Sequence, residues 1–215
     1  MIATPSPWDT EVFGYTVGKI HSDGKRTFSY DVGKLNREKF NVVFVKSDGW
    51  VDPYGDIVEA VDHLYDMEFK ALEKLYPFGI SEMTATSAHM QLAGRAFKDS
   101  RFLRDVRLRD HVPEMYYKWL FGKTVWVLKG AEESAFLLPD VDQDGARRIS
   151  LVAVDERHRG MGVGRLLVSS VLRTEMPATW RVKVSCRNHQ AVRFYETVGF
   201  RVKNICTAYH IWTDL

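Results

Sequence analysis

The segment DERHRGMGVGRLL, residues 155–167, decides the fold of this 215-residue chain. Glycines stand at 160, 162 and 164, after two arginines and a histidine and before an apolar run with helical spacing. Backbone N–H groups in a glycine turn between a strand and a helix can converge on phosphate, because no Cβ atoms screen them. The segment therefore predicts a phosphate-binding loop that opens a helix.

Composition narrows the classes of protein that the chain can be. Hydrophobic residues make up 45% and charged residues 27%, and 30 basic against 28 acidic residues leave a net charge of +2, too small to indicate nucleic-acid binding by itself. The two cysteines, Cys186 and Cys206, form neither a metal-site spacing nor a disulfide framework. The chain has no signal-peptide pattern and no apolar run of about 20 residues. We expect a soluble, cytoplasmic protein without a metal.

Hydrophobic periodicity predicts an alternation of strands and helices. Strands are expected over 11–21, 41–47, 123–129, 133–139, 147–154, 179–186 and 200–212. Helices are expected over 56–67, 107–121, 164–176 and 189–198. This order predicts a mixed α/β fold. Residues 64–78 also resemble 194–210, as a helix that ends in Tyr and an acidic residue before a strand, which suggests that the N-terminal half is a partial copy of the C-terminal half.

The spacing of the glycines separates three kinds of phosphate loop. A P-loop requires Gly-Lys-Ser or Gly-Lys-Thr, which the chain lacks, and a dinucleotide loop requires G-x-G-x-x-G early in a βαβ unit. The pattern Arg/Gln-x-x-Gly-x-Gly/Ala fits instead, with Arg159, Gly162 and Gly164 at its fixed positions. A tight turn without a ligand is the alternative interpretation of the glycines alone.

This pattern resembles the coenzyme A pyrophosphate loop of the GNAT superfamily of N-acyltransferases. ISLVAV, residues 149–154, is similar to the strand before that loop, and 184–200 is similar to the next strand and helix. In that second segment the match rests on Asn188, Ala191, Tyr195, Gly199 and Phe200. The resemblance covers about 123–212. It implies a mixed, mostly antiparallel, twisted sheet flanked by helices, with a catalytic domain over 96–215 and an incomplete half-copy over 1–95.

The resemblance also implies how coenzyme A binds. The strands at 149–154 and 180–186 splay apart, and the pantetheine arm pairs with the backbone of Leu151, Val152 and Val154 like an added strand. The N–H of Val152 then polarises the thioester carbonyl. The expected coenzyme-binding residues of the loop and the following helix are Arg159, Gly160, Met161, Gly162, Val163, Gly164, Arg165, Asn188 and Ala191. Arg157 adds charge there or is a solvated surface arginine.

Tyr195 is the expected general acid, because the resemblance places its hydroxyl beside the thioester sulfur. A phenol with a reference pKa of about 10 can protonate a thiolate whose conjugate thiol has a pKa of about 8.5. A core tyrosine on an amphipathic helix is the alternative. The sequence selects no general base, and His89, His111 and His158 stay without a role. His210 is expected to point outward on the last strand.

The N-terminal half resembles the dTDP-fucosamine acetyltransferase group, which acetylates an amine on a nucleotide-linked deoxysugar. The matching residues are Trp8, Asp9, Phe13, Gly14, Ser100, Arg101, Phe102, Asp105, Tyr116 and Trp119. From this resemblance Ser100, Arg101 and Phe102 are expected to bind the substrate. The basic run of 98–109 suits a nucleotide diphosphate, or it is a solvated segment whose arginines pair with Asp99, Asp105 and Asp110. The chain departs from the pattern of that group at 66–69, where it has DMEF, and at 104–110, where it has the arginine-rich RDVRLRD. These departures place the identity of the sugar in doubt.

Together these observations predict direct transfer of an acyl group, expected to be acetyl, from an acyl-coenzyme A co-substrate to an amine. Neither cysteine occupies a marked nucleophile position, so no covalent intermediate is implied. The favoured acceptor is a nucleotide-linked amino-deoxysugar; a polyamine, an antibiotic or a protein amine is the alternative, and a coenzyme A-binding sensor without turnover is another. No nucleic-acid or membrane partner is expected, and strand edges at 123–139 or in the last strand could mediate a homodimer.

Overall fold

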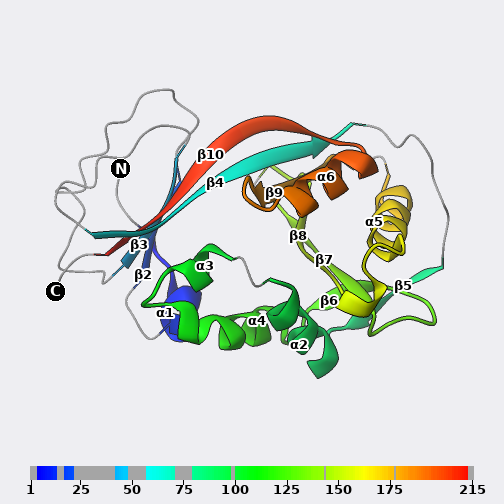
Figure 1. The fold of residues 1–215 in the computed structure, drawn as a ribbon, viewed down its shortest axis with the longest axis horizontal. Helices are drawn as coiled ribbons and strands as arrows, with labels where there is room; N and C mark the ends of the chain where they lie inside the picture. The colour runs from blue at the N-terminus through cyan, green and yellow to red at the C-terminus, as the bar shows by residue number, and fades with distance from the viewer. Residues whose placement is uncertain are drawn as a thin grey trace. The chain divides into compact units, whose positions relative to one another are not determined.

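The computed structural model describes residues 4–13, 17–21, 42–47, 57–70, 79–97, 100–142, 144–176 and 178–212. Its strands, coloured along the chain in Figure 1, are β1 (Thr4–Pro5), β2 (Val17–His21), β3 (Val42–Ser47), β4 (Ile57–Phe69), β5 (Ile80–Thr84), β6 (Thr124–Leu128), β7 (Ala135–Val141), β8 (Arg147–Val154), β9 (Trp180–Ser185) and β10 (Phe200–Trp212). Its helices are α1 (Pro7–Phe13), α2 (Ser87–Ala96), α3 (Arg101–Arg104), α4 (Val112–Leu120), α5 (Val163–Thr174) and α6 (His189–Val198), with 3₁₀ turns η2 (Arg109–His111) and η3 (Glu156–His158). No helix in these ranges is long and apolar enough to cross a membrane.

The chain forms two compact units, and each combines separate pieces of the sequence. Unit 1 contains Met1–Leu64, Asp99–Met115 and Ile205–Leu215, and unit 2 contains Tyr65–Lys98 and Tyr116–Asn204. The sequence interpretation instead divided the chain at 95/96. The idea that residues 1–95 are an incomplete copy stays a prediction.

Unit 1 is built on a sheet in the strand order β1-β2-β3-β10-β4. Strands β2 and β3 are parallel, whereas β3 and β10 are antiparallel, from Thr207↔Ser47 to Trp212↔Val42. The valines of β3 are buried. β-Branched residues suit such a strand, since their stiff side chains pack well on a pleated surface.

Unit 2 is a mixed sheet in the strand order β10-β4-β9-β8-β7-β6-β5, to which β4 and β10 contribute residues 65–69 and 200–204. The pairs from β5 to β8 are antiparallel, and β8 and β9 are parallel. Helices cover both faces, as alternation along β7 shows: Leu137 joins the cluster formed with α5, whereas the Phe136 ring meets His89 on α2. The predicted sheet flanked by helices is therefore confirmed.

The core of unit 2 lies between the sheet and helices α5 and α6. It includes Trp180 and Val182 from β9, Phe200 from β10, and the apolar face of α5. The apolar residues of α5 recur every three to four positions, so one face of the helix is buried. This core fixes the ends of β8 and β9 and the start of α5.

The structure confirms most of the predicted elements in the second half of the chain. The strands over 147–154 and 200–212 and the helix over 189–198 have the expected bounds. The helix expected over 56–67 is wrong, because the described residues 57–67 belong to β4. The spacing of its apolar residues fits both the helical and the strand period, and pairing with the neighbouring β9 and β10 selects the strand. The resemblance between 64–78 and 194–210 is wrong for the same reason, since 64–69 is not the end of a helix.

The strand expected over 11–21 is also wrong in its first part. Of the described residues in this range, those up to Phe13 belong to α1 and Val17–His21 form a strand. Pro7 occupies the first helical position, where its missing N–H costs nothing. Ser6 precedes it, and its hydroxyl donates to Asp9 while its carbonyl accepts from the N–H of Thr10. These contacts start a helix where alternation alone indicated a strand.

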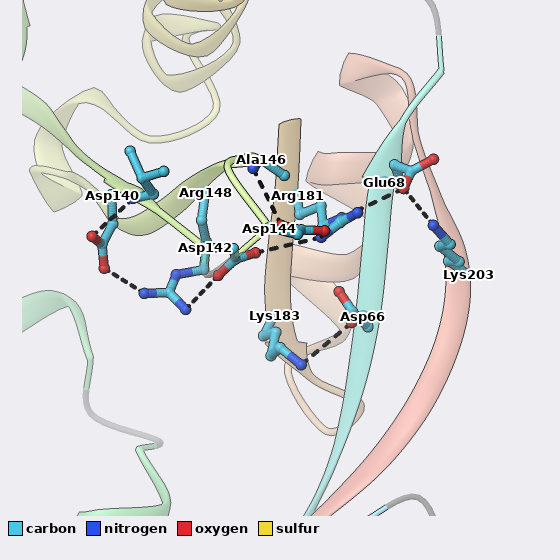
Figure 2. A network of polar contacts seen from close by, with 11 residues as sticks. Asp66, Glu68, Asp140, Asp142, Asp144, Ala146, Arg148, Arg181, Lys183 and Lys203 are labelled. Atoms are coloured by element: carbon cyan, nitrogen blue, oxygen red, sulfur yellow. Dashed lines mark hydrogen bonds and ion pairs between the residues drawn. The ribbon is translucent and has the colours of Figure 1, made fainter. Parts of the chain in front are cut away.

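Figure 2 shows a network of charged side chains in unit 2 that includes residues of β4, β9 and β10. Arg181 on β9 contacts Asp144 at 2.6 Å and Glu68 on β4 at 3.5 Å. Lys203 on β10 and Lys70 each contact Glu68 at 2.7 Å. One carboxylate thus bridges cations from three parts of the unit. The hydrogen bonds from Lys203 and Lys70 lower the pKa of Glu68 from its ordinary value to about 2.

Replacing this carboxylate should destabilise the protein in a pH-dependent way. A lowered pKa means that the ionised Glu68 stabilises the folded state above its ordinary pKa of 4.5, and that this stabilisation is lost as the pH falls towards about 2. Glu68→Gln should therefore lower the free energy of unfolding by about 1 kcal/mol at pH 7. Urea unfolding at pH 7 and pH 3.5 should show the deficit shrinking in acid. A deficit that does not change with pH would contradict this. Glu82→Gln, at an exposed position of β5, is the control.

Candidate functional site

Strands β8 and β9 diverge in unit 2, as the sequence interpretation predicts. Their parallel pairing runs from Arg147↔Trp180 to Ile149↔Val182, and no described pairing continues beyond it. From Leu151 to Val154, β8 is therefore paired to β7 on its other side alone. Alternate residues of this stretch direct their N–H and C=O groups towards the β9 side. The result is an opening lined by backbone donors and acceptors.

A β-bulge lies at the base of this opening. On the β7 side the register steps from Pro139↔Ile149 to Leu138↔Leu151, so Ser150 is an extra residue in β8. A bulge bends the strand and increases its twist. It lies directly after the last residue that pairs with β9, and it therefore accounts for the divergence of the two strands.

The glycine loop follows the end of β8 and leads into α5. Gly160 has φ +76° and Gly162 has φ +82°, conformations in which a residue with a Cβ is strained, and the space beside both is open. Gly162 is the N-cap of α5 and supplies no side-chain hydrogen bond to the first turn. The first turn of an α-helix has backbone N–H groups without intrahelical partners, which favour anions. The loop thus has the geometry of an anion-binding turn.

Two contacts tie the loop to its neighbours. The Arg159 Nε donates to the carbonyl of Val154 at 3.1 Å. A Cβ at Gly164 would lie 3.2 Å from Val154 and 3.3 Å from the Phe194 ring, so the start of α5 packs closely on β8 and α6. These contacts place the loop at the opening between the strands.

Arg157 is paired within its own turn. Its guanidinium bonds the Asp155 carboxylate at 3.0 and 3.2 Å, and the Asp155 side chain also accepts from the Arg157 N–H. These hydrogen bonds lower the pKa of Asp155 to about 2. A cavity of about 370 Å³ adjoins this turn; its lining is Leu92, Arg95, Asp155, Glu156, Arg157 and Arg159.

Tyr195 lies inside the core of unit 2, on the helix that follows β9. Its ring makes edge contacts with Phe194 and Phe200 at centroid distances of 5.1 and 5.5 Å. It shares one hydrophobic cluster with Val152 and Val154 of the strand opening. Burial raises the pKa of the Tyr195 phenol, because the phenolate is poorly solvated there. The side chain is thus held protonated beside the elements that form the opening.

Asn188 and Ala191 begin the helix that carries Tyr195. The Asn188 side chain accepts from the Ala191 N–H at 3.0 Å, which makes it the N-cap of α6.

His158 is half-buried in η3, and its Nδ1 has no hydrogen-bond partner among the described residues. Met161, between the two glycines at positive φ, is exposed, as is Arg165 on the first turn of α5.

The residues expected to bind the acceptor belong to unit 1. Ser100 caps α3 by accepting from the Phe102 N–H at 3.3 Å. Phe102 is buried against Phe44, and Arg101 is half-buried with its guanidinium 4.3 Å from the Phe102 ring. Of the acidic partners considered for the basic run, Asp99 lies outside the described residues. Asp105 bonds His210, Arg104 pairs with Asp62 at 3.0 Å, and the Arg109 Nε lies 3.9 Å from Asp110, as the solvated alternative expects.

The expectation that His210 points outward is wrong. His210, Ile211 and Trp212 are all buried, so both faces of β10 are covered at this end. Alternation indicates an exposed face only where one side of a sheet meets water. His210 lies between Asp105 and Arg101, which both belong to the segment 100–105 that carries the resemblance, and no pattern around His210 itself indicates these contacts. His89 is also buried, and its ring nitrogens bond Thr86 and the carbonyl of Glu132.

Comparison with known proteins supports this description of unit 2. Residues 122–202 match the acetyltransferase (GNAT) domain. A spore coat polysaccharide biosynthesis protein, SpsD, of Bacillus subtilis is 28% identical over 65% of this chain and 53% of its own length. The chain thus spans about half the length of this curated relative.

Solved structures with low sequence identity share the fold. A putative acetyltransferase of the GNAT family from Novosphingobium aromaticivorans has a TM-score of 0.58 at 17% identity, over 81% of this chain and 75% of that one. A conserved protein of unknown function from Staphylococcus epidermidis has a TM-score of 0.56 at 14% identity, over 83% and 75%. These likenesses concern the arrangement of helices and strands.

Proposed function

We propose that the chain is an N-acetyltransferase that moves an acetyl group directly from acetyl-coenzyme A to an amine, because residues 122–202 match the acetyltransferase (GNAT) domain. The observation that carries the proposal is the opening between β8 and β9 next to a loop with two glycines at positive φ. The opening offers unpaired strand backbone to an extended pantetheine arm, and the loop offers N–H groups to a diphosphate. Both parts of coenzyme A therefore have a matching surface.

The chain's own groups supply the polar steps of the reaction. We assign Leu151, Val152 and Val154 to backbone pairing with the pantetheine, and the Val152 N–H to polarising the thioester carbonyl. The amine must lose a proton before it attacks, and for an amine of pKa near 8 a small neutral fraction at pH 7 can serve. Attack forms a tetrahedral centre whose nitrogen is positively charged. This nitrogen loses a second proton to solvent, and collapse of the centre breaks the carbon–sulfur bond. We assign the protonation of the departing thiolate to Tyr195, whose buried phenol is in its acid form at neutral pH.

The favoured acceptor is a nucleotide-linked amino-deoxysugar. The resemblance of Ser100, Arg101 and Phe102 to a nucleotide amino-sugar group supports this, and so does the relative named for spore coat polysaccharide biosynthesis. Arginine also suits a diphosphate because its planar fork pairs with two oxygens at once.

The acceptor class is testable by thiol release from acetyl-coenzyme A with a panel of amines. The panel contains dTDP- and UDP-linked amino-deoxysugars, their free sugars, polyamines and lysine peptides. We expect turnover with a nucleotide-linked sugar and a much higher KM for the matching free sugar, because the free sugar lacks the diphosphate. Turnover with peptides or polyamines alone would overturn the sugar acceptor and keep the transferase. No turnover with any amine, while acetyl-coenzyme A binds, would indicate a sensor.

A further inference from the structure

The cavity of about 370 Å³ beside the glycine loop lies between α2 and the turn that follows β8, within unit 2. Leu92 and Arg95 of α2 form one wall, and four residues of 155–159, which lead into the glycine loop, form the other. Pockets that bind small molecules measure about 300 to 1,000 Å³. The cavity is therefore large enough for a phosphate group and part of the molecule that carries it.

This cavity lies on the face of β8 that is opposite the core of unit 2. Val152 and Val154 pack in the core with the residues of α5. Ala153 pairs with Phe136, whose ring contacts His89, so α2 lies on the other face of the sheet. A second substrate cannot reach the strand opening through the packed core. It has to approach on the α2 face, which is the face of the cavity.

Two of the charges in the lining cancel each other. The Arg157 guanidinium bonds the Asp155 carboxylate at 3.0 and 3.2 Å. These bonds, together with the one from the Arg157 N–H, lower the pKa of Asp155 to about 2, so the carboxylate is ionised at neutral pH and stays paired. Arg157 is therefore a counterion within the turn and adds no net charge to the cavity.

Arg95 and Arg159 supply the remaining positive charge. Among the described residues, the ion-pair contact of Arg95 is with Asp155 at 3.7 Å, which is longer than a hydrogen bond. The Arg159 Nε is fixed on the Val154 carbonyl at 3.1 Å, so this guanidinium is held at the end of β8. The exposed carboxylate of Glu156 opposes the two guanidinium groups. The lining as a whole has a net charge of +1, with an arginine on each wall.

We propose that this cavity is a phosphate subsite of the acceptor, in which Arg95 binds the diphosphate of the nucleotide-linked sugar. A guanidinium group suits this ligand because it pairs with two phosphate oxygens at once. From Val152, to which the thioester carbonyl is assigned, to Asp155 the strand advances about 10 Å, a length that a sugar ring and its phosphate span. The subsite is separate from the glycine loop, and the inference rests on the proposed nucleotide-sugar acceptor.

Calorimetry with dTDP tests the subsite on the full chain without turnover. The protein is first saturated with coenzyme A, which occupies the glycine loop, so that dTDP does not bind there. Arg95→Gln should weaken dTDP binding about 5- to 20-fold, the loss expected for a charge-assisted hydrogen bond at a partly exposed site. Arg173→Gln is the matched control, because Arg173 is also an exposed arginine in the last turn of a helix. It should change the affinity less than about twofold.

Glu156→Gln should produce a gain of affinity, which a folding defect cannot imitate. The change removes the exposed carboxylate that opposes an anion in the cavity, and it should strengthen dTDP binding about two- to threefold. Both the loss in Arg95→Gln and the gain in Glu156→Gln should shrink as salt is added, because salt screens exposed charges. Unchanged binding in Glu156→Gln would contradict the subsite.

The remaining outcomes separate this inference from the proposed function. Equal dTDP binding by wild type and Arg95→Gln, or no binding to the coenzyme-loaded protein, would overturn the inference and leave the transferase intact. Weaker binding of acetyl-coenzyme A in Arg95→Gln, but not of its 3′-dephospho form, would assign the cavity to the coenzyme and overturn the acceptor subsite. Arg95-dependent dTDP binding without turnover of any nucleotide sugar would overturn the proposed function alone.

Discussion

Tyr195→Phe should lower kcat about 100- to 1000-fold while the KM for acetyl-coenzyme A stays near that of the wild type. Loss of a positioned general acid costs this much, and the phenyl ring preserves the packing against Phe194 and Phe200. Since burial raises the pKa of the phenol, the wild-type kcat should not fall between pH 7 and 9.5 through loss of this proton. Steady-state kinetics with the acceptor found in the panel measures both effects.

A matched control separates catalysis from loss of a buried hydroxyl. Tyr116 is also buried in unit 2, on α4, and Tyr116→Phe removes the same atom from another helix. We expect Tyr116→Phe to keep kcat within about threefold. A Tyr195→Phe variant that folds normally and retains kcat within about fivefold would show that another group protonates the thiolate.

Gly162→Ala should raise the KM for acetyl-coenzyme A at least tenfold. A Cβ at φ +82° strains the loop, and the turn then relaxes away from the conformation that directs its N–H groups at a diphosphate. The strain also lowers the free energy of unfolding by about 1 kcal/mol. Kinetics at varied acetyl-coenzyme A and urea unfolding measure the two effects on the same samples.

Gly145 provides the control for this change. It has φ +81° in the turn between β7 and β8, and the space beside it is as open as at Gly162. Gly145→Ala should cost a similar free energy of unfolding and leave the KM unchanged. If both variants raise the KM equally, the loop has no special role in binding the coenzyme.

The sequence predicts the elements around the glycine loop better than the contacts of residues 100–105. The loop, β8 and α6 are local elements, with spacing and turn glycines that determine them, and their bounds agree with expectation. The apolar spacing of β4 wrongly predicts a helix, because it fits the helical as well as the strand period. That β4 is a strand depends on β9 and β10, which are far away in the sequence. The Asp105–His210 pair joins residues 105 positions apart, and no local pattern indicates such a contact.

The balance of acetyl groups in a single turnover tests the central claim most directly. The protein, in excess over acetyl-coenzyme A labelled in its acetyl group, is mixed with the acceptor and quenched at intervals, and the label is followed on coenzyme, protein and amine. The account predicts that the label passes from coenzyme to amine, that free thiol appears in equal amount, and that the protein never carries label. Label bound covalently to the protein before the amine is acetylated, or thiol released without any acetylated amine, would contradict it.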